Sequence, residues 1–578
     1  MRYYFGNLRP YLAALAWTIA RVQRWAIDEV GVDPKYADVF TKEEIDGVAL
    51  ADMTYEKFRE YHISGGAATK LFAGVKALFP EVFLPRSPPP IEDAEPPPIV
   101  SLWRYFLKDQ PSFEVGEVIE SFDLGVLMNT TTLFIRPCYP KLFDLIFALA
   151  AGPNKRSGAL VIGTPGTGKS TSLIYCLRRL ASFNPVPTVY FESQFVGFAW
   201  VLRPDGSFAQ FPSGSGVPRE FSKSSFYLFD PAKDQIGGPR WAEACTIVAS
   251  SPNPKHYKEF HDRQLPQTLH MPTWSLEELN QFGVHKGIAE DKILERFNVF
   301  GGTLRSILDE TDESRFSLEN ALSKAHPEKL RDLVVHKESE VEHSHILFHM
   351  MASDDFKSTA PVFASKYVRD SILKKTTDPA HRLQRLADFF NGLRSVPRSE
   401  SLQGHTLEEI GHTVLSRPQR SFSIRKVGSP NVGTTFDIPA NIKQCEFKSL
   451  ALIQLPVTEP SYFVPIDSNL GAIDSLMIEI DGSISFFQTT VSLNHGINFN
   501  QLNKHLDWFQ AANPSQAKVR LYFVVHQEIF DVMPKQDFDM KSFTKAVADD
   551  RRIKHKVQYI EDHRQRAESI VEQWVLGI

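Results

Sequence analysis

Residues 158–180 of this 578-residue chain constrain its fold more than any other stretch. The apolar run 159–162 is long enough for a buried strand, and residues 163–170 fit the phosphate-binding loop pattern G-x-x-x-x-G-K-[ST]. Apolar residues then recur in 172–180 at the spacing of one helix face. Because the pattern requires a strand, a glycine loop and a helix in this order, the sequence predicts a nucleoside-triphosphate site.

The residue types of the loop suit this chemistry. Glycines let the backbone wrap a phosphate chain without Cβ clashes, and the N–H groups of the loop and of the helix N-terminus face the anion. Lys169 can reach the β- and γ-phosphates, and Ser170 can offer its hydroxyl to Mg²⁺. We therefore expect ATP or GTP with Mg²⁺, bound by a set of loop residues: Gly163, Thr164, Pro165, Gly166, Thr167, Gly168, Lys169, Ser170 and Thr171.

The metal of such a site also needs an acid on a neighbouring strand. Residues 225–230 form a hydrophobic run that ends in Asp230, which we predict to hold Mg²⁺ together with Ser170 and to act in hydrolysis. Pro231 follows where many ATPases have a Glu that orients water, so the sequence favours nucleotide binding over fast hydrolysis. Glu192 ends the strand-like run 188–191 and is a weak substitute for the missing base, since an acid at a strand end is usually a solvated turn residue.

Composition excludes several other classes of protein. The net charge is −5, so any contact with DNA would need a local basic patch. The four cysteines are far apart and form no C-x-x-C, which argues against a zinc site or a disulfide framework and indicates a reducing compartment. No stretch reaches the roughly 20 apolar residues of a membrane span. Apolar residues 11–20 faintly resemble a signal peptide, but a helix that leads into the first domain is favoured.

The expected fold class is multidomain α/β. Periodicity and composition divide the chain into an N-terminal helix (1–21), a small helical domain (22–80), a proline-rich linker (81–98), a P-loop NTPase with a parallel sheet (99–310), a helical lid or connector (311–400) and a C-terminal α/β domain (401–578). Within the lid, His345 and His349 are spaced for one helix face, and a solvated face is favoured over a metal site because no H-E-x-x-H arrangement is present.

The helical domain resembles a sterile-alpha-motif (SAM) domain. The resemblance rests on Trp25, on Tyr-Ala-Asp-x-Phe at 36–40, on Ile-Asp-Gly-x-x-Leu at 45–50 and on the long final helix, whereas His62 departs from the family's usual glycine. The expected core contains Trp25, Phe40, Ile45, Leu50, Phe58, Leu71, Val75 and Leu78. The resemblance implies protein–protein association, often self-association or capture of another SAM domain; a small helical domain without a partner is the alternative.

A wider resemblance covers roughly residues 100–400. The order of motifs is similar to that of the NTPase of Crinkler effectors and related retrotransposon-hot-spot proteins, and it consists of the P-loop, Asp230, residues 250–253, Pro272-x-Trp274 and Gly301-Gly302-x-x-Arg305. Arg305 could reach a phosphate from the helical lid. The alternative for Arg305 is an exposed arginine at a helix start.

Residues alone identify the C-terminal region only as an α/β domain. Its segments resemble the nuclease domain at the C-terminus of Crinkler NTPases, including Phe487-Gln488-x-Thr490-Val491-Ser492 and His495. The resemblance implies a restriction-endonuclease-like site in which Glu408, Asp474 and Gln488 bind Mg²⁺ or Mn²⁺. Gln488 replaces the usual second acid, which should lower metal affinity, and Thr490 replaces the usual lysine, for which His495 or Lys504 could substitute.

Two functional hypotheses remain from the sequence. In the first, nucleotide binding rearranges the lid around 270–400 and repositions a metal-dependent, DNA-directed nuclease-like domain. In the second, SAM-driven assembly is switched by nucleotide, and an inactive nuclease fold only binds DNA or protein. The resemblance implies a secreted effector that acts in a host nucleus; a cytoplasmic or nuclear protein that is not secreted is the alternative.

Overall fold

The computed structural model describes residues 17–46, 49–50, 53, 55–78, 96–119, 132–151, 158–214, 221–232, 238–309, 311–325, 334, 344–374, 379–429, 433–466, 470–550 and 552–578. The chain forms two compact units, one of Met1–Val161 with Lys169–Thr268 and one of Ile162–Gly168 with Leu269–Ile578. Most of the predicted N-terminal helix (1–21) and proline-rich linker (81–98) lies outside the described residues.

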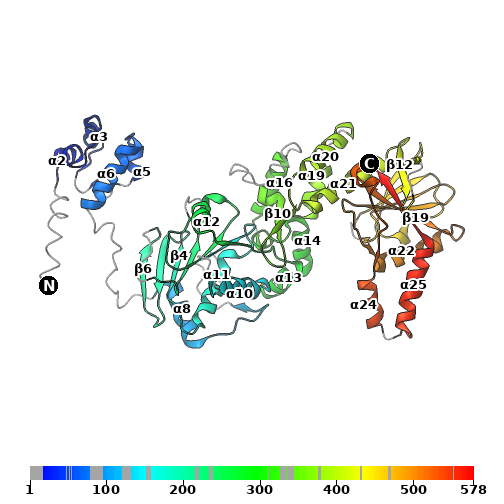
Figure 1. Cartoon of the computed structure of the whole chain (residues 1–578), viewed down its shortest axis with the longest axis horizontal. Helices are drawn as coiled ribbons and strands as arrows, with labels where there is room; N and C mark the ends of the chain where they lie inside the picture. Colours follow the sequence, from blue (N-terminus) through cyan, green and yellow to red (C-terminus); the bar gives the residue numbers. More distant parts are fainter. Residues whose placement is uncertain are drawn as a thin grey trace. The chain divides into compact units, whose positions relative to one another are not determined.

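The small helical domain has the predicted apolar core. Its helices gather at the N-terminal end of the chain (Figure 1): α2 (Ile19–Arg24), η1 (Trp25–Glu29), η2 (Pro34–Tyr36), α3 (Ala37–Lys42), α5 (Tyr55–Glu60) and α6 (Gly65–Leu78). Trp25, Phe40, Leu50 and Val75 are all buried, and Leu78 packs against them from a partly exposed position. An apolar residue every three or four positions therefore holds these short helices together.

The region that contains the glycine loop is built around a seven-stranded sheet. Its order is β6-β5-β4-β7-β8-β3-β9, with bounds β3 (Gly158–Ile162), β4 (Val189–Ser193), β5 (Phe198–Leu202), β6 (Phe208–Pro212), β7 (Phe226–Asp230), β8 (Cys245–Ser250) and β9 (Gln267–His270). β4, β7 and β8 pair in parallel, but β5 and β6 extend the sheet as antiparallel strands. The pairing of β4, β7 and β8 agrees with the predicted parallel sheet, and a hairpin after β4 adds two antiparallel strands that were not predicted.

Alternating side chains give this sheet two distinct faces. Phe226 of β7 contacts Phe147 of α10 (Cys138–Ala151) and Phe183, which follows α11 (Lys169–Ala181). The next residue, Tyr227, contacts Tyr190 of β4 on the opposite face. Phe226, Leu228 and Asp230 therefore share the face with α10, while Tyr227 and Phe229 share the other. A further helix, α8 (Pro98–Asp109), opens this region, and α12 (Lys258–Gln264) follows β8.

The predicted helical lid contains a hairpin. Its elements are α13 (Leu276–His285), α14 (Glu290–Phe300), α15 (Leu304–Leu308), α16 (Glu313–Lys324), α18 (Ser344–Leu347), β10 (Phe348–Ala352), β11 (Thr359–Phe363), α19 (Lys366–Lys374) and α20 (Pro379–Leu393). His349 lies in β10 and is 3% exposed, so the predicted solvated helix face is wrong. Burial, and to a smaller extent His345, lowers the pKa of His349 to about 4 and keeps it neutral.

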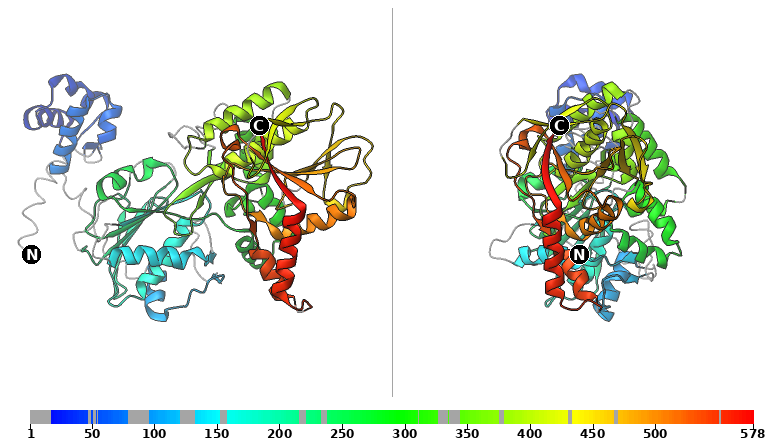
Figure 2. Two further views of the ribbon diagram at one scale, coloured as in Figure 1. Left: turned by 45° about the vertical axis from the view of Figure 1, so that its right-hand side comes forward. Right: turned by 90° about the vertical axis from the view of Figure 1, so that its right-hand side faces the viewer.

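The C-terminal region has an eight-stranded mixed sheet of order β13-β12-β21-β19-β17-β16-β15-β14. The bounds are β12 (Ser421–Lys426), β13 (Thr434–Asp437), β14 (Lys443–Phe447), β15 (Ser461–Pro465), β16 (Ser475–Ile478), β17 (Ile484–Thr489), β19 (Val519–Val525) and β21 (Val571–Gly577). β15, β16 and β17 are successive antiparallel neighbours, and β19 adds in parallel to β17. The flanking helices are α21 (Glu400–Leu415), α22 (Phe499–Ala512), α23 (Gln527–Phe530), α24 (Lys541–Asp549) and α25 (Lys556–Ile570), and β21 continues directly from α25 (Figure 2).

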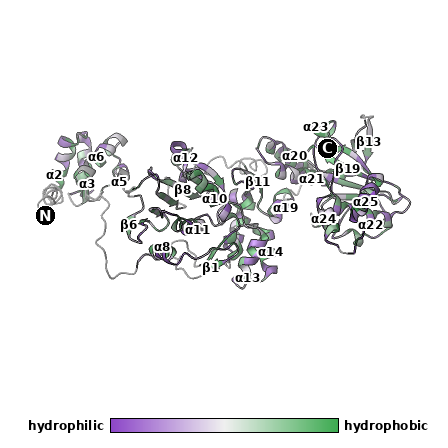
Figure 3. Cartoon of the chain, turned by 60° about the horizontal axis from the view of Figure 1, so that its bottom comes forward, coloured by the Kyte–Doolittle hydropathy of each residue, from purple (hydrophilic) through white to green (hydrophobic). Residues whose placement is uncertain are grey.

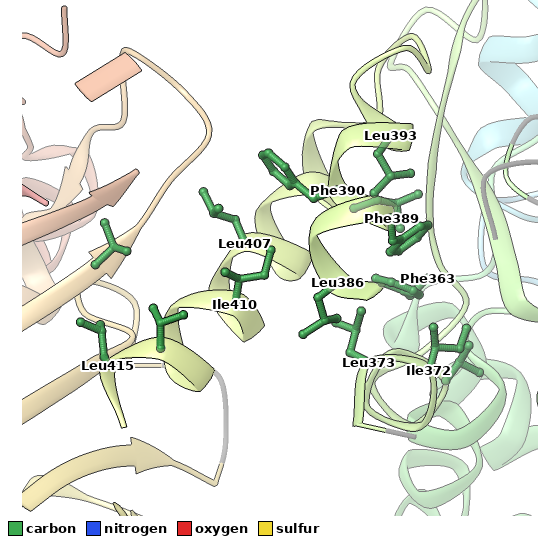
Figure 4. Close-up of a cluster of buried hydrophobic side chains, with 14 of the residues drawn as sticks. Phe363, Ile372, Leu373, Leu386, Phe389, Phe390, Leu393, Leu407, Ile410 and Leu415 are labelled. Atoms are coloured by element: carbon green, nitrogen blue, oxygen red, sulfur yellow. The ribbon is translucent and has the colours of Figure 1, made fainter. Parts of the chain in front are cut away.

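The two faces of the C-terminal sheet belong to different apolar clusters. Phe487 and Tyr522 stack at a centroid distance of 5.4 Å within the cluster that includes α20 and α21. Phe486 faces the other way, toward Phe509 of α22. Figure 4 shows the first cluster at α20 and α21, and Figure 3 shows that α24 and α25 carry both hydrophilic and hydrophobic residues, as helices on a sheet surface should. Helix α21 thus connects the core of the lid with the core of the C-terminal sheet.

Candidate functional sites

The glycine loop between β3 and α11 is tightly enclosed. Gly166 has φ +82°, and a Cβ built there would lie 3.3 Å from Cβ of Arg305. A Cβ on Gly163 would lie 2.9 Å from the carbonyl oxygen of Met271. Thr167 Oγ1 donates a hydrogen bond to the Thr164 carbonyl at 2.9 Å, which closes the turn. The loop therefore has the sharp, side-chain-free path that a wrapped anion requires.

The residues that directly follow the loop meet the predicted acid. Ser170 Oγ donates a hydrogen bond to Asp230 Oδ1 at 2.7 Å, and both Lys169 and Asp230 are buried. Burial raises the pKa of Asp230 to about 6, although the Ser170 hydrogen bond and the Lys169 charge act to lower it. A buried carboxylate beside a hydroxyl offers the oxygen ligands that Mg²⁺ prefers, so this donor set fits the expected metal.

Glu192 lies on the other face of the sheet from Asp230. Its carboxylate accepts hydrogen bonds from Tyr227 Oη at 2.5 Å, from Ser213 Oγ at 2.6 Å and from the Gly214 N–H at 2.9 Å. These bonds tie β4 to β7 and to the residues after β6. Because Glu192 accepts three hydrogen bonds and lies on the other face of the sheet from Asp230, the geometry argues against Glu192 as the base that would replace the missing glutamate.

The two lid motifs meet each other and the loop. The Trp274 N–H donates to the Gly302 carbonyl at 2.9 Å, and a Cβ on Gly302 would lie 2.2 Å from the Trp274 carbonyl oxygen. Three residues later, Arg305 has its Cβ against Gly166 and its side chain exposed. The segments 272–274 and 301–305 therefore form one contact region beside the loop. The exposed side chain of Arg305 is compatible both with the predicted phosphate contact and with the alternative of an exposed arginine at a helix start.

A second polar site lies between α21 and the C-terminal sheet. Glu408 lies 3.5 Å from Nδ1 of His405 and 3.7 Å from Nε2 of His412. Burial acts to raise the pKa of Glu408, but the hydrogen bonds from His405 and His412 outweigh burial and lower it. Burial, and next the negative charge of Glu408, raises the pKa of Asp474 to about 7. Two mutually repelling, partly buried carboxylates make a place where a cation would be stabilised.

A β-bulge directs Asp474 toward this site. The Asp474 N–H donates to the Phe487 carbonyl at 2.7 Å, although Phe487 already pairs with Ser475 in the ladder of β16 and β17. Two consecutive residues thus oppose one, which re-aims the first side chain. Asp474 Oδ2 consequently accepts the Thr489 N–H at 2.6 Å. Thr489 lies against α21, since a Cβ on Gly411 would be 3.4 Å from its hydroxyl.

The predicted convergence of Gln488 with Glu408 and Asp474 is not what the structure shows. Gln488 shares the face of Phe486, and its Nε2 lies 2.8 Å from Nε2 of His495. Among the described residues, no hydrogen bond joins Gln488 to either acid, and its buried Oε1 has no partner. The side-chain period of two in a strand explains the error, because Thr489 rather than Gln488 faces α21. Thr490 accepts the Ser492 N–H at 3.1 Å and so caps the turn after β17.

Sequence reasoning missed the residues that surround the acid pair. Nδ1 of His412 lies 2.9 Å from the hydroxyl of Tyr462, which lies 2.7 Å from Oγ of Ser475. The spacing of His405, Glu408 and His412, i,i+3 and i,i+4 on one helix face, was a signal visible in the sequence. Within the described part of the chain, no three His, Cys, Asp or Glu residues group closely enough to hold a metal by themselves. The acid pair therefore needs other oxygen ligands, such as phosphate or water, to complete a cation site.

These features define a multidomain α/β protein with a glycine loop between a strand and a helix and a separate pair of partly buried carboxylates. No protein-family model matches the chain. It is similar to two curated proteins of Phytophthora infestans. "Crinkler effector protein 15" is 26% identical over 417 residues, which are 68% of this chain and 64% of that protein. "Crinkler effector protein 16" is 26% identical over 418 residues, which are 68% of this chain and 63% of that protein.

The similarity supports the resemblance to Crinkler effectors that the motifs predict. The aligned region covers just under two thirds of the length of these relatives. Helices among the described residues are all too short or too polar to cross a membrane.

Proposed function

We propose that this chain is a Crinkler-type effector in which nucleotide bound at the glycine loop controls a metal-dependent, DNA-directed site in the C-terminal region. The name of the relatives supports the effector role, and a secreted protein that acts in a host nucleus is the corresponding setting. The observation that carries the proposal is a continuous series of contacts, all within the second compact unit, from Gly166 to Glu408.

The series begins at the glycine loop. Gly166 packs against Thr303 and Arg305, and the Thr303 N–H donates to the Gly301 carbonyl at 3.0 Å. Gly301 has φ +66°, and a Cβ there would lie 1.9 Å from the carbonyl oxygen of Ala364. The two backbones are in direct contact here, so a displacement of 301–305 would also displace the end of β11.

The series then enters helix α21. Phe363 precedes Ala364, and its ring centroid lies 6.4 Å from that of His405. His405 is one of the two histidines that flank Glu408. Next to Glu408, Glu409 forms an ion pair with Arg382 of α20, with both side chains largely buried. A shift of the lid would therefore change the position of Glu408 relative to Asp474.

Beside the glycine loop, Ser170 and Asp230 would hold Mg²⁺, and Lys169 would contact phosphate oxygens. Pairing of Lys169 with the β- and γ-phosphates stabilises the nucleotide by charge. The hydroxyl of Ser170, which donates to Asp230 without a metal, would turn its lone pair to the cation. Binding is the expected principal event, because Pro231 leaves no glutamate next to Asp230.

At the acid pair, Glu408 and Asp474 would hold Mg²⁺ or Mn²⁺. After α21 and the strands β12, β13 and β14, the chain continues with the antiparallel strands β15, β16 and β17. Helix α22 then leads to β19, which lies parallel to β17, and this arrangement supports the restriction-endonuclease-like interpretation. A metal there would polarise a scissile phosphate and lower the pKa of a water. The chain's own residues would orient the carboxylates: His405 and His412 hold Glu408, and the Thr489 N–H holds Asp474.

A scaffold function is the second candidate, in which SAM-driven assembly is switched by nucleotide and the C-terminal region binds DNA or protein without cleavage. The position of Gln488 beside His495 favours this candidate, because the acid pair then lacks the predicted third protein ligand. DNA cleavage by the purified chain with Mg²⁺ or Mn²⁺ separates the two. Cleavage that disappears in Asp474→Ala supports the nuclease; DNA binding without cleavage in the wild type supports the scaffold.

A further inference from the structure

We infer that the Ser193 hydroxyl positions the attacking water for nucleotide hydrolysis in place of the missing glutamate; this inference rests on the proposed nucleotide site. Ser193 is the last residue of β4 and is the parallel ladder partner of Asp230, the last residue of β7. Neighbouring strands lie about 4.8 Å apart. Since ladder partners share a face, Ser193 and Asp230 lie side by side at the carboxyl edge of the sheet.

The Ser193 hydroxyl is buried without a hydrogen-bond partner among the described residues, which is unusual for a polar group. The residue is 1% exposed, and its Oγ has no hydrogen-bond partner among the described residues. An unpaired buried hydroxyl lowers the stability of the folded chain, because it loses its hydrogen bonds to water without replacement. Buried polar groups without partners are uncommon, and a ligand or an ordered water is the usual explanation.

Hydrogen bonds fix the backbone around Ser193. The missing partner of its hydroxyl is therefore not explained by fraying at the end of β4. The Gln194 N–H donates to the Asp230 carbonyl at 3.0 Å, and the Gln194 side chain accepts the Ala232 N–H at 3.2 Å. The Gly197 N–H donates to the Ser193 carbonyl at 3.0 Å. Ser193 is thus fixed on the face of the Ser170–Asp230 pair, with only its hydroxyl left to satisfy.

Both acids near this edge are already engaged. Glu192 points to the opposite face and accepts three hydrogen bonds, and Asp230 accepts the Ser170 hydroxyl. Ser193 offers both a donor and two acceptor lone pairs. It could therefore accept a hydrogen bond from a water that approaches the terminal phosphate of a bound nucleotide.

The reaction that Ser193 would assist is hydrolysis of the bond between the γ-phosphorus and the β,γ-bridging oxygen. The water oxygen forms a bond to the γ-phosphorus, the bridging oxygen leaves with the bonding electrons on the nucleoside diphosphate, and the proton of the water passes to a phosphate oxygen. Ser193 orients the water and does not take the proton, because a serine hydroxyl is a poor base. Turnover should consequently be slow, as a switch requires.

The test is Ser193→Ala in the full chain, with Thr246→Val as the matched control. Thr246 Oγ1 is also buried without a partner among the described residues, but it lies within β8 as the ladder partner of Tyr227, on the face opposite Asp230. Single-turnover hydrolysis of ATP and GTP with Mg²⁺ is measured beside the Kd of each nucleotide and the melting temperature of the nucleotide-free protein.

Ser193→Ala should slow hydrolysis about 10- to 100-fold, with the nucleotide Kd unchanged within about twofold and an unchanged or higher melting temperature. Thr246→Val should leave hydrolysis unchanged. An unchanged rate in Ser193→Ala, or a lowered melting temperature that reveals a structural role, would overturn the inference. A wild-type chain that binds nucleotide without hydrolysing it also overturns it but leaves the proposed site standing; a wild type that binds none overturns both.

Discussion

The glycine-loop site and the acid pair of α21 differ in how their residues are brought together. Lys169 and Ser170 follow the loop directly, and a single hydrogen bond connects Ser170 to Asp230, the end of a neighbouring strand. Glu408 and Asp474 instead come from a helix and from a bulge in β16, and Thr489 of β17 completes their contacts. The first site is encoded by one short pattern, whereas the second depends on the register between strands.

The largest expected effect tests the local site. Lys169→Ala removes the buried cation that faces the phosphates, so nucleotide affinity should fall by roughly 100-fold or more. Lys258→Ala, which removes an exposed lysine of α12, should leave it unchanged. Calorimetric titration with ATP and GTP measures both. A folded Lys169→Ala protein with the affinity of the wild type would remove the loop from its proposed role.

The next effect tests the acid pair through stability. The pKa of Asp474 is raised to about 7 in the folded chain, so its contribution to stability is full below pH about 4 and is lost as the pH rises through 7. Asp474→Asn should therefore stabilise the metal-free protein at pH 8 by on the order of 4 kcal/mol, and the difference should nearly vanish near pH 4. Denaturant unfolding at the two pH values measures it.

Metal addition provides the control for that prediction. Mn²⁺ should raise the stability of the wild type at pH 8, because it compensates the two neighbouring negative charges, and should have little effect on Asp474→Asn. Equal stabilisation of both proteins would show that the cation binds elsewhere. A pH-independent difference between the two proteins would contradict the raised pKa.

A smaller effect tests whether the two sites communicate. Phe363→Leu keeps a buried apolar side chain at the end of β11 but removes the ring that faces His405. In the wild type, a non-hydrolysable nucleotide should change the affinity for Mn²⁺ at the acid pair about 5- to 10-fold. In Phe363→Leu this change should shrink to about twofold, with nucleotide affinity retained. Gly404→Ala on α21, where an added Cβ meets open space, is the control that should preserve the coupling.

The smallest expected effect tests whether Gln488 lies at the metal, as predicted from the sequence, or beside His495, as in the structure. If Gln488 bound the metal, Gln488→Glu would add a charged ligand and raise the affinity for Mn²⁺. Because Gln488 faces His495 on the other side of the sheet, we expect a change of no more than about twofold. A rise of tenfold or more would restore the position predicted from the sequence.

These cases show which parts of the molecule a sequence can reveal. The apolar core of the helical domain, the strand–loop–helix of residues 158–181 and the ending of β7 at Asp230 follow from local periodicity and loop chemistry. The hairpin β10–β11 and the antiparallel strands β5 and β6 were not predicted, because a short apolar run in the sequence does not show which strand it pairs with.

The error at Gln488 has a more specific cause. A strand shifted by one residue presents its other face, and only the structure shows that Thr489 faces α21 and that a bulge turns Asp474 toward it. Glu408 and Asp474 were predicted from the family resemblance, whereas His405 and His412 were overlooked although their spacing around Glu408 was visible. Arg305 and Gly166 are in contact although they are 139 positions apart in the chain, and no local sequence pattern indicates this contact.

The measurement that tests the central claim most directly is cleavage of linear and supercoiled DNA by the full chain with Mn²⁺, with and without a non-hydrolysable nucleotide. If nucleotide controls the acid pair, the rate of cleavage by the wild type should change with nucleotide, cleavage by Lys169→Ala should not respond to nucleotide, and Asp474→Ala should not cleave. Cleavage that persists in Asp474→Ala, or that responds to nucleotide equally in Lys169→Ala and the wild type, would contradict that claim.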